Sequence, residues 1–356
     1  MTTKEHKRDY FGSEMAEDDI QIESRMENMS IGNLTSNSKL FDKPQPLIYT
    51  DKAGPLQLNG DVLTQLSHIN KKLNVVCVCG SYRTGKSYLM NWIAGDKTGF
   101  NLGDTVRSET KGIWIWCREH PKQSDQVLVL LDTEGFGDPE KRDPEHDNKM
   151  FCLALLMSST LIINVKSVIE YSTLKELEYP FSIHLAIHSE GVSFGGEPDD
   201  SYNVQLQSED DDKAEEKHNA KTIQIASPTL IMCIRDFYLE MMMDGRLQTA
   251  NEYLEANLKS VELSTLSEKQ QKKQKKSNNI NECIKAYFPK RTCFTIAQPA
   301  MGGNLKNIEQ LDETSLDKTF VEDIKALQNY VYDRKPKYIC NASKKPLEGP
   351  VYDATV

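Results

Sequence analysis

Apolar stretches separated by polar segments recur along the chain and give the first indication of its fold. Four of them are almost continuously apolar and have the length of buried strands: residues 73–79, 126–132, 160–165 and 228–234. A fifth, residues 147–159, is long enough for a buried helix. Buried strands that alternate with helices are typical of α/β proteins, so we predict a mostly parallel central sheet with helices on both faces.

Weaker patterns predict further elements around this sheet. They are a hairpin, two more strands and two helices, at residues 44–50 with 56–59, 112–117, 289–296, 61–66 and 317–332. The last of these segments carries Phe320, Ile324, Leu327 and Val331 along one side of the expected helix. That side would pack against the sheet.

Polar segments divide the chain. Residues 1–43 hold few large apolar residues, and the acidic segment 191–225 cannot bury enough apolar surface to become ordered, so we expect disorder in the first and a mobile loop in the second. The basic stretch 270–277 we interpret as a solvated loop, with a dedicated anion or membrane site as the alternative. The folded domain then covers residues 44–335, and the tail 336–356 is expected to add no helical domain.

Composition and charge exclude several classes of partner and location. A net charge of −10 over 356 residues gives no overall electrostatic reason to bind nucleic acid or an anionic membrane. The eight cysteines lie mostly inside apolar runs and show no zinc-type spacing. The chain starts without the apolar core of a secretion signal, and no apolar run is long enough to cross a bilayer. We therefore expect a cytoplasmic protein with no nucleic-acid partner and no intrinsic membrane anchor.

A glycine-rich loop follows the first buried strand and leads into a helical stretch. It consists of Gly80, Ser81, Tyr82, Arg83, Thr84, Gly85, Lys86 and Ser87, which matches the phosphate-binding pattern Gly-x-x-x-x-Gly-Lys-Ser/Thr. The glycines let backbone amides surround a polyphosphate, and the helix directs its positive end at it. We expect Lys86 to neutralise the β- and γ-phosphates and Ser87 to hold Mg²⁺ as the cofactor.

Arg83 adds a second cation to this loop. Its guanidinium can fold back over the phosphates as an arginine finger, which stabilises the charge that develops during γ-phosphoryl transfer. It can equally be a solvated loop arginine or pair with a nearby carboxylate. Spacing alone leaves these alternatives open.

A second element of a phosphate site ends the strand 126–132, 46 residues after Lys86. It consists of Asp132, Thr133, Glu134 and Gly135. In nucleotidases with a phosphate loop, a carboxylate at this place holds Mg²⁺ through water, and a following glycine amide meets the γ-phosphate. The separation from Lys86 leaves room for a helix, a switch loop and one antiparallel strand.

The polar loop 101–112 lies between these two elements and is the candidate switch. Thr110 can join the metal shell when a γ-phosphate is present, and Ser108 can align the attacking water; an ordinary hydroxyl-rich turn is the alternative for both. We expect Leu102, Gly103 and Asp104 of this loop to contact the nucleotide.

Base selection needs a further residue, because the Asn-Lys-x-Asp motif of small GTPases is absent. Arg235 and Asp236 follow the strand 228–234, where a carboxylate can accept the N1 and N2 hydrogens of guanine. Adenine offers no such pair of donors, so Asp236 would select GTP over ATP. On its own, an Arg-Asp pair is more often a solvated surface pair.

Taken together, residues 80–91, 110–114, 131–135 and 234–237 resemble the guanylate-binding proteins, which are large dynamin-like GTPases. The resemblance implies that Arg83 is the internal arginine finger, Ser108 the water-positioning serine and Thr110 the Mg²⁺-sensing threonine. It also implies that Glu134 is a carboxylate in the second layer of residues around the nucleotide and that Arg235 and Asp236 recognise guanine.

The same resemblance implies hydrolysis of GTP, in some members as far as GMP, a nucleotide-dependent dimer with itself or with related GTPases, and a role in interferon-type innate immunity. Two residues depart from the family pattern: Ser81 replaces a larger apolar residue, and Glu109 replaces a histidine. A carboxylate near the phosphates can slow the water step. The alternatives are therefore a non-hydrolysing, nucleotide-gated interaction module that pairs with full-length relatives, and an ATPase or small-molecule kinase.

Overall fold

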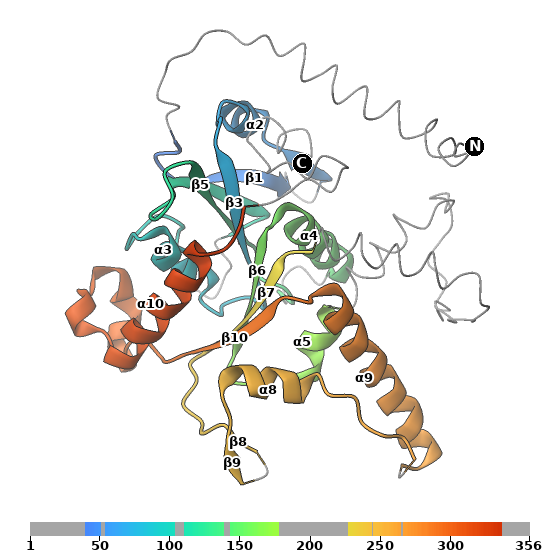
Figure 1. Ribbon diagram of the computed structural model, residues 1–356. Helices are drawn as coiled ribbons and strands as arrows, with labels where there is room; N and C mark the ends of the chain where they lie inside the picture. The colour runs from blue at the N-terminus through green and yellow to red at the C-terminus, as the bar shows by residue number, and fades with distance from the viewer. Residues whose placement is uncertain are drawn as a thin grey trace, which may run out of the picture.

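An eight-stranded sheet forms the centre of the part of the chain that the structure describes (Figure 1). This structure is a computed structural model, and it describes residues 40–50, 54–103, 110–138, 143–177, 227–243, 245–264 and 266–336. The strand order is β10-β7-β6-β3-β5-β4-β1-β2. The strands are β1 Gln45–Thr50, β2 Leu56–Leu58, β3 Lys72–Cys79, β4 Ile113–Glu119, β5 Gln126–Thr133, β6 Thr160–Lys166, β7 Thr229–Arg235 and β10 Arg291–Ile296.

The strands from β10 to β5 are parallel, and β4, β1 and β2 extend the sheet in antiparallel fashion. The predicted mostly parallel sheet is therefore confirmed, as is the hairpin of β1 and β2. One antiparallel strand, β4, lies in the chain between the phosphate loop and Asp132, as the spacing predicts.

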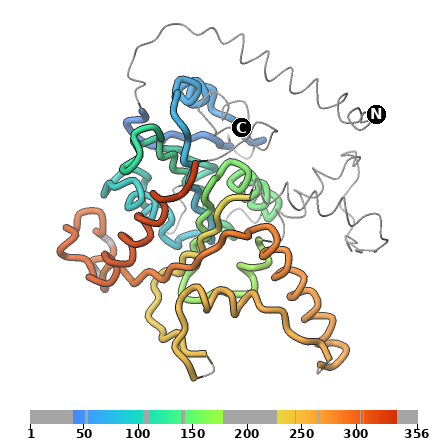
Figure 2. Tube along the Cα trace, in the orientation of Figure 1, coloured from blue at the N-terminus to red at the C-terminus, as the bar shows by residue number. Residues whose placement is uncertain are grey.

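Helices cover both faces of the sheet, with α3 and α10 on one side and α4 on the other (Figures 1 and 2). The α-helices are α2 Gly60–Ser67, α3 Lys86–Ala94, α4 Pro144–Met157, α5 Tyr171–Glu176, α8 Ala250–Asn257, α9 Glu268–Tyr287 and α10 Lys318–Tyr332. The short strands β8 Met242–Met243 and β9 Arg246–Leu247 form a separate hairpin, and the 3₁₀ turns η1 Gly302–Gln310 and η2 Glu313–Ser315 precede α10. Tyr88, Trp92 and Phe320 pack their rings together and join α3 to α10.

The prediction of a basic loop at residues 270–277 is wrong, because this stretch lies inside the 20-residue helix α9. Ser267 and Gln270 form a reciprocal capping box at its start, and lysine and glutamine are good helix formers. Ile284 and Tyr287 bury the other end of the helix. The first half of α9 has no apolar face of its own. It is helical because its start is capped and its other end is packed against the core.

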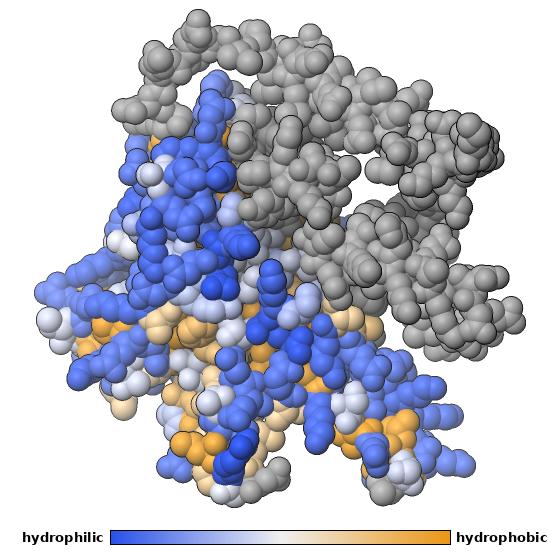
Figure 3. Space-filling view, in the orientation of Figure 1, coloured by the Kyte–Doolittle hydropathy of each residue, from blue (hydrophilic) through white to orange (hydrophobic). Residues whose placement is uncertain are grey.

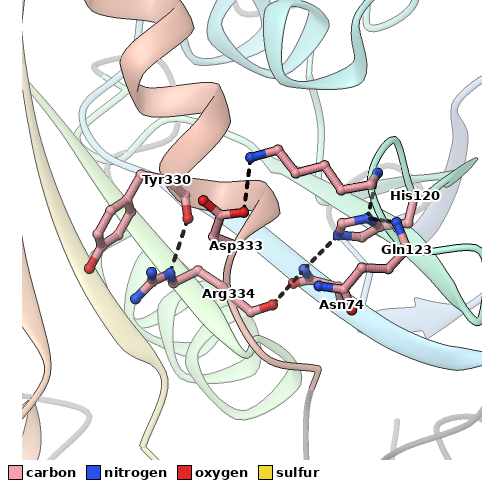
Figure 4. Close-up of polar contacts among 7 residues, drawn as sticks. Asn74, His120, Gln123, Tyr330, Asp333 and Arg334 are labelled. Carbon is pink, nitrogen blue, oxygen red and sulfur yellow. Dashed lines mark hydrogen bonds and ion pairs between the residues drawn. The ribbon is translucent and has the colours of Figure 1, made fainter.

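The end of α10 is hydrogen-bonded to the end of β3 that lies far from the phosphate loop (Figure 4). The Asn74 amide in β3 donates to the Arg334 carbonyl at 3.2 Å and lies 3.3 Å from the His120 Nε2 atom. The backbone amides of Lys122 and Gln123 both donate to the His120 Nδ1 atom. One buried histidine therefore connects the β4–β5 turn to β3, whose asparagine holds the end of α10.

Three predictions lie wholly or mostly outside the described ranges: disorder in residues 1–43, the mobile acidic loop 191–225 and the tail 336–356. Of the first segment the structure describes residues 40–43, where Phe41 is buried and its carbonyl accepts from the Trp116 Nε1 atom at 3.1 Å, so the prediction of disorder is wrong for this part. In the described chain, each helix is too short or too polar to cross a membrane.

Candidate functional site

The phosphate loop, residues 80–87, has a backbone conformation that favours glycine at two positions. Gly80 and Gly85 have φ angles of 142° and 79°. A Cβ atom on Gly80 would lie 2.2 Å from the Asn164 carbonyl oxygen in β6, so the loop passes directly over the neighbouring strand. Gly85 is the N-cap of α3, whose first amides face the loop.

Lys86 is buried at the start of α3, with 7% of its surface exposed. Its Nζ atom donates to the Ser81 carbonyl at 3.0 Å, so the side chain curls back beneath the loop. Burial lowers the pKa of Lys86, while the nearby charge of Asp132 acts in the opposite direction. A cation in this position is suited to an anionic ligand that lies above the loop.

Three oxygen-bearing side chains meet beside Lys86. The hydroxyls of Ser87 and Thr110 donate to the Asp132 Oδ2 atom at 2.6 Å and 3.1 Å. The two hydroxyl oxygens lie 3.4 Å apart. The structure thus brings together the three residues that the sequence assigns to the metal, from α3, the segment before β4 and the end of β5.

These residues fit a divalent cation. Asp132 is fully buried, and its Oδ1 atom has no hydrogen-bond partner among the described residues, which is costly for a carboxylate unless a ligand or ion completes its contacts. Burial also raises the pKa of Asp132, against the hydrogen bonds from Ser87 and Thr110 and the charge of Lys86. A carboxylate and two hydroxyls form a set of hard oxygen donors, the kind that Mg²⁺ prefers.

Glu134 is buried and links the segment after β5 to the segment before β4. Its Oε2 atom accepts from the Gly112 amide at 2.8 Å, and its own amide donates to the Gly112 carbonyl at 2.9 Å. The Oε1 atom contacts the Nε2 atom of His146 in α4. Because Gly112 lies two residues after Thr110, Glu134 fixes the position of the candidate switch threonine.

The segment after Glu134 pairs with the phosphate loop. The Tyr82 amide donates to the Phe136 carbonyl at 3.0 Å, and the Phe136 amide donates to the Gly80 carbonyl at 3.1 Å. A Cβ atom on Gly135 would lie 2.1 Å from the Tyr82 Cα atom. A side chain at residue 135 would therefore force the two segments apart.

Arg83 has a left-handed backbone, with φ at 60°, and an exposed side chain. Its Nη1 atom donates to the Gly103 carbonyl at 2.8 Å. The guanidinium therefore joins the phosphate loop to the switch loop. This contact leaves the choice between an arginine finger and a structural arginine open.

Arg235 and Asp236 take different positions at the end of β7. Arg235 is buried, its Nη1 atom donates to the Gly85 carbonyl at 3.3 Å, and its Nε atom lacks a partner. Asp236 has a φ of 54° and a partly exposed carboxylate 3.9 Å from the Lys166 Nζ atom. Of the two, only Asp236 presents its side chain outward, so Arg235 braces the phosphate loop.

The remaining predicted residues brace backbone or lie outside the described chain. Thr84 donates to the Ser81 carbonyl at 2.8 Å, and the buried Thr133 donates to the Val78 carbonyl at 2.8 Å. Leu102 packs against the core. Asp104, Ser108 and Glu109 of the switch loop lie outside the described residues.

Sequence reasoning missed two residues of this site. Asn164 is buried in β6, its amide donates to the Thr84 carbonyl at 2.9 Å, and its Oδ1 atom has no partner in the part of the chain that the structure describes. His146, in α4, contacts Glu134. In the sequence, Asn164 stands out as a polar residue inside the apolar run 160–165. No feature of the sequence marks His146 in this way.

Comparison with known proteins agrees with this geometry. The family model of the N-terminal domain of guanylate-binding proteins matches residues 53–339. Guanylate-binding protein 7 of Mus musculus is 40% identical over 278 residues, which are 78% of this chain and 40% of that protein. Guanylate-binding protein 2 of Homo sapiens is 39% identical over 314 residues, which are 88% of this chain and 49% of that protein.

The chain spans less than half the length of these relatives. A solved structure of translation elongation factor SelB from Methanococcus maripaludis, in complex with the GTP analogue GppNHp, matches 76% of this chain and 36% of that one, at 8% identity and a TM-score of 0.31. That likeness is too distant to add to the argument. The family match covers the phosphate loop, the switch segment and the end of β7, and the chain therefore belongs to the guanylate-binding protein family.

Proposed function

We propose that this chain binds GTP together with Mg²⁺ and hydrolyses it to GDP. The observation that carries the proposal is the meeting of Ser87, Thr110 and Asp132 beside the buried Lys86. Family membership supports a guanine nucleotide as the ligand. The geometry of the glycine loop supports a polyphosphate as the ligand, because its backbone amides lie at the N-terminus of α3.

Each residue of the cluster has a separate task in this proposal. The hydroxyls of Ser87 and Thr110 would hold Mg²⁺ directly, and Asp132 would hold it through water. When bound, Mg²⁺ neutralises charge on the β- and γ-phosphates. Thr110 would reach the ion only with a γ-phosphate present, so that the switch loop reports the nucleotide state.

Hydrolysis requires Arg83 to leave the Gly103 carbonyl and turn toward the phosphates. The contact is exposed and involves one carbonyl, so replacing it is inexpensive compared with breaking a buried ion pair. Ser108 would align the attacking water, and Glu134 would keep Thr110 and Gly112 in place. Asp236 would accept the guanine N1 and N2 hydrogens.

By family resemblance, the GTP-bound chain would form a dimer with itself or with related GTPases, and it would act in innate immune defence. GMP as a further product is part of the same proposal. Nucleotide analysis by chromatography separates GDP from GMP, and a mixture of this chain with a relative tests the mixed dimer.

Phosphate release from GTP tests the proposed activity. We expect release in the presence of Mg²⁺, its loss with a chelator, and its loss in Lys86→Ala. We also expect GTP to bind more tightly than ATP, and Asp236→Asn to reduce that preference by about tenfold or more, because one carboxylate contact is lost. Equal affinity for the two nucleotides in both proteins would favour an ATPase or a kinase.

One observation favours a second candidate function, a nucleotide-gated interaction module without turnover. Arg83 is already engaged with Gly103 in the described conformation. If that contact persists with GTP bound, the chain would bind nucleotide and change its switch loop without hydrolysis. Binding of GTP without phosphate release would establish this alternative.

A further inference from the structure

The first half of α9 carries a dense group of positive charges, which we call the lysine stripe. It consists of five exposed lysines within eight residues: Lys269, Lys272, Lys273, Lys275 and Lys276. Four of them, at positions 269, 272, 273 and 276, follow the i, i+3, i+4, i+7 spacing and so share one side of the helix. The only carboxylate between residues 268 and 276 is Glu268.

These lysines contribute nothing visible to the fold. Within the described residues, the ion pairs of the chain involve other groups, and none of the five lysines takes part in one. The buried residues of α9 all lie in its second half, from Ile280 to Tyr287. Within the described chain, the charged half therefore has no buried residue, and Lys273 shares a shallow groove of 250 Å³ with Tyr171 of α5.

The lysine stripe also lies away from the central sheet. In Figures 1 and 2, α9 runs outward from the sheet, and its N-terminal end is farthest from it. Eleven residues of helix separate Lys269 from Ile280, which corresponds to about 16 Å. Since the Debye length is about 8 Å at physiological salt, charges on the sheet are largely screened at the first turn of α9.

Exposed apolar side chains lie at the same end of the molecule. The hairpin of β8 and β9 and the tip of α9 are the two lowest parts of the described chain in Figure 1, and Figure 3 shows hydrophobic side chains there beside hydrophilic ones. The exposed apolar residues are Tyr171, Tyr238, Leu239, Met242, Leu247 and Val261. Tyr238, before the hairpin, is 77% exposed and Leu247, in β9, is 67% exposed, and exposed apolar side chains that gather at one end of a molecule mark an interaction site.

From this combination we infer that the end of the molecule formed by the lysine stripe and the β8–β9 hairpin docks on an anionic lipid membrane. The lysines face lipid phosphates and carboxylates, and the apolar side chains enter the interface between headgroups and acyl chains. Two projections on one end can reach a flat surface together. The inference does not depend on GTP hydrolysis.

The apolar residues favour a membrane over a nucleic acid. A duplex would use the lysines through its phosphates but would gain nothing from Leu247 or Met242. A membrane uses both kinds of residue. Neutralising lysines should therefore weaken either interaction, whereas removing the hairpin side chains should weaken only membrane docking.

Vesicle flotation with the full chain tests the inference. The probes are vesicles of phosphatidylcholine alone and vesicles with equal parts of phosphatidylserine, in GDP at low salt. We expect binding only to the anionic vesicles and its loss at about 0.5 M salt, where charges are screened. The variant K272Q/K275Q/K276Q should bind about 100-fold more weakly, since each lysine near an anionic surface contributes about fivefold.

Matched variants separate charge from position. Glutamine is used because it keeps the helix propensity of lysine. The control K97Q/K318Q/K325Q removes the same number of charges at and near α10. It should bind vesicles like the wild type. M242S/L247S should reduce vesicle binding severalfold and leave the affinity for a short RNA duplex unchanged. The inference is overturned if the wild type ignores anionic vesicles, if the α9 variant and the control bind equally, or if the duplex binds more tightly than the vesicles.

Discussion

At the scale of single residues, the phosphate site combines groups from one motif with groups from other strands. Lys86 and Ser87 come from the loop itself, and Asp132 follows from its place after a buried strand. Asn164 reaches the loop from β6, because the parallel register sets β6 beside β3. That register depends on the whole sheet, so the sequence could predict the loop and the carboxylate but not the asparagine that supports them.

Asn164→Ala should weaken GTP binding roughly tenfold, because the Thr84 carbonyl loses its donor and stays buried. The turnover rate with saturating GTP should change much less, since Asn164 positions the loop and does not touch the reacting atoms. Calorimetry for affinity and saturating kinetics for turnover measure the two effects separately.

Thr160→Val is the matched control for this prediction. Thr160 lies in the same strand, is fully buried, and has a hydroxyl that lacks a partner. Removing that hydroxyl should leave nucleotide affinity and stability nearly unchanged. A loss of affinity in both variants would mean that β6 is merely disturbed, and Asn164 would have no special role.

At the scale of elements, helix α9 and the end of α10 show where sequence patterns succeed and fail. The helix of residues 317–332 is readable because Phe320, Ile324, Leu327 and Val331 repeat at helical spacing, and all four are buried. The first half of α9 has no apolar period, so only its cap and its packed second half explain why it is helical. Pattern reasoning detects packing faces, and this half has none.

The His120 contact predicts a dependence of stability on pH. Burial lowers the pKa of His120 from 6.5, with Asp125 raising it and Lys122 lowering it further. As pH falls below about 6.5, the unfolded chain gains a proton that the folded chain does not, so the free energy of unfolding decreases until the lower folded pKa is reached.

His120→Gln should remove this part of the pH dependence and cost about 1–3 kcal/mol at neutral pH, because the amides of Lys122 and Gln123 lose their acceptor. Urea unfolding between pH 5 and pH 8 measures both effects. His68→Gln, at an exposed position, is the control and should keep the wild-type slope. An unchanged slope in the His120 variant would show that another group causes the loss of stability in acid.

At the scale of the whole molecule, the carboxyl ends of the parallel strands bring the candidate nucleotide site together at one edge of the sheet, and Asn74 holds the end of α10 at the opposite edge. The sequence could predict this α/β plan because its buried strands are strongly apolar. It could not predict that a charged helix extends beyond the sheet, because the direction of α9 depends on its packing against α5 and the rest of the core.

The proposed dimer belongs to this scale. Light scattering should give the mass of a monomer with GDP and twice that mass with GDP and aluminium fluoride, since the pairing requires the transition-state arrangement of Arg83 and the switch loop. Arg83→Lys tests the link, because it keeps the charge but loses the guanidinium fork. Equal masses in both nucleotide states would remove the dimer from the proposal.

The most direct measurement of the central claim is single-turnover phosphate release from GTP and Mg²⁺, compared between the wild type and Arg83→Ala. If Arg83 acts as the arginine finger of a GTPase, the wild type should release phosphate about 10³-fold faster than the variant, and both should bind GTP with similar affinity. Equally slow release by the two proteins would contradict the account and would leave a nucleotide-binding module without turnover.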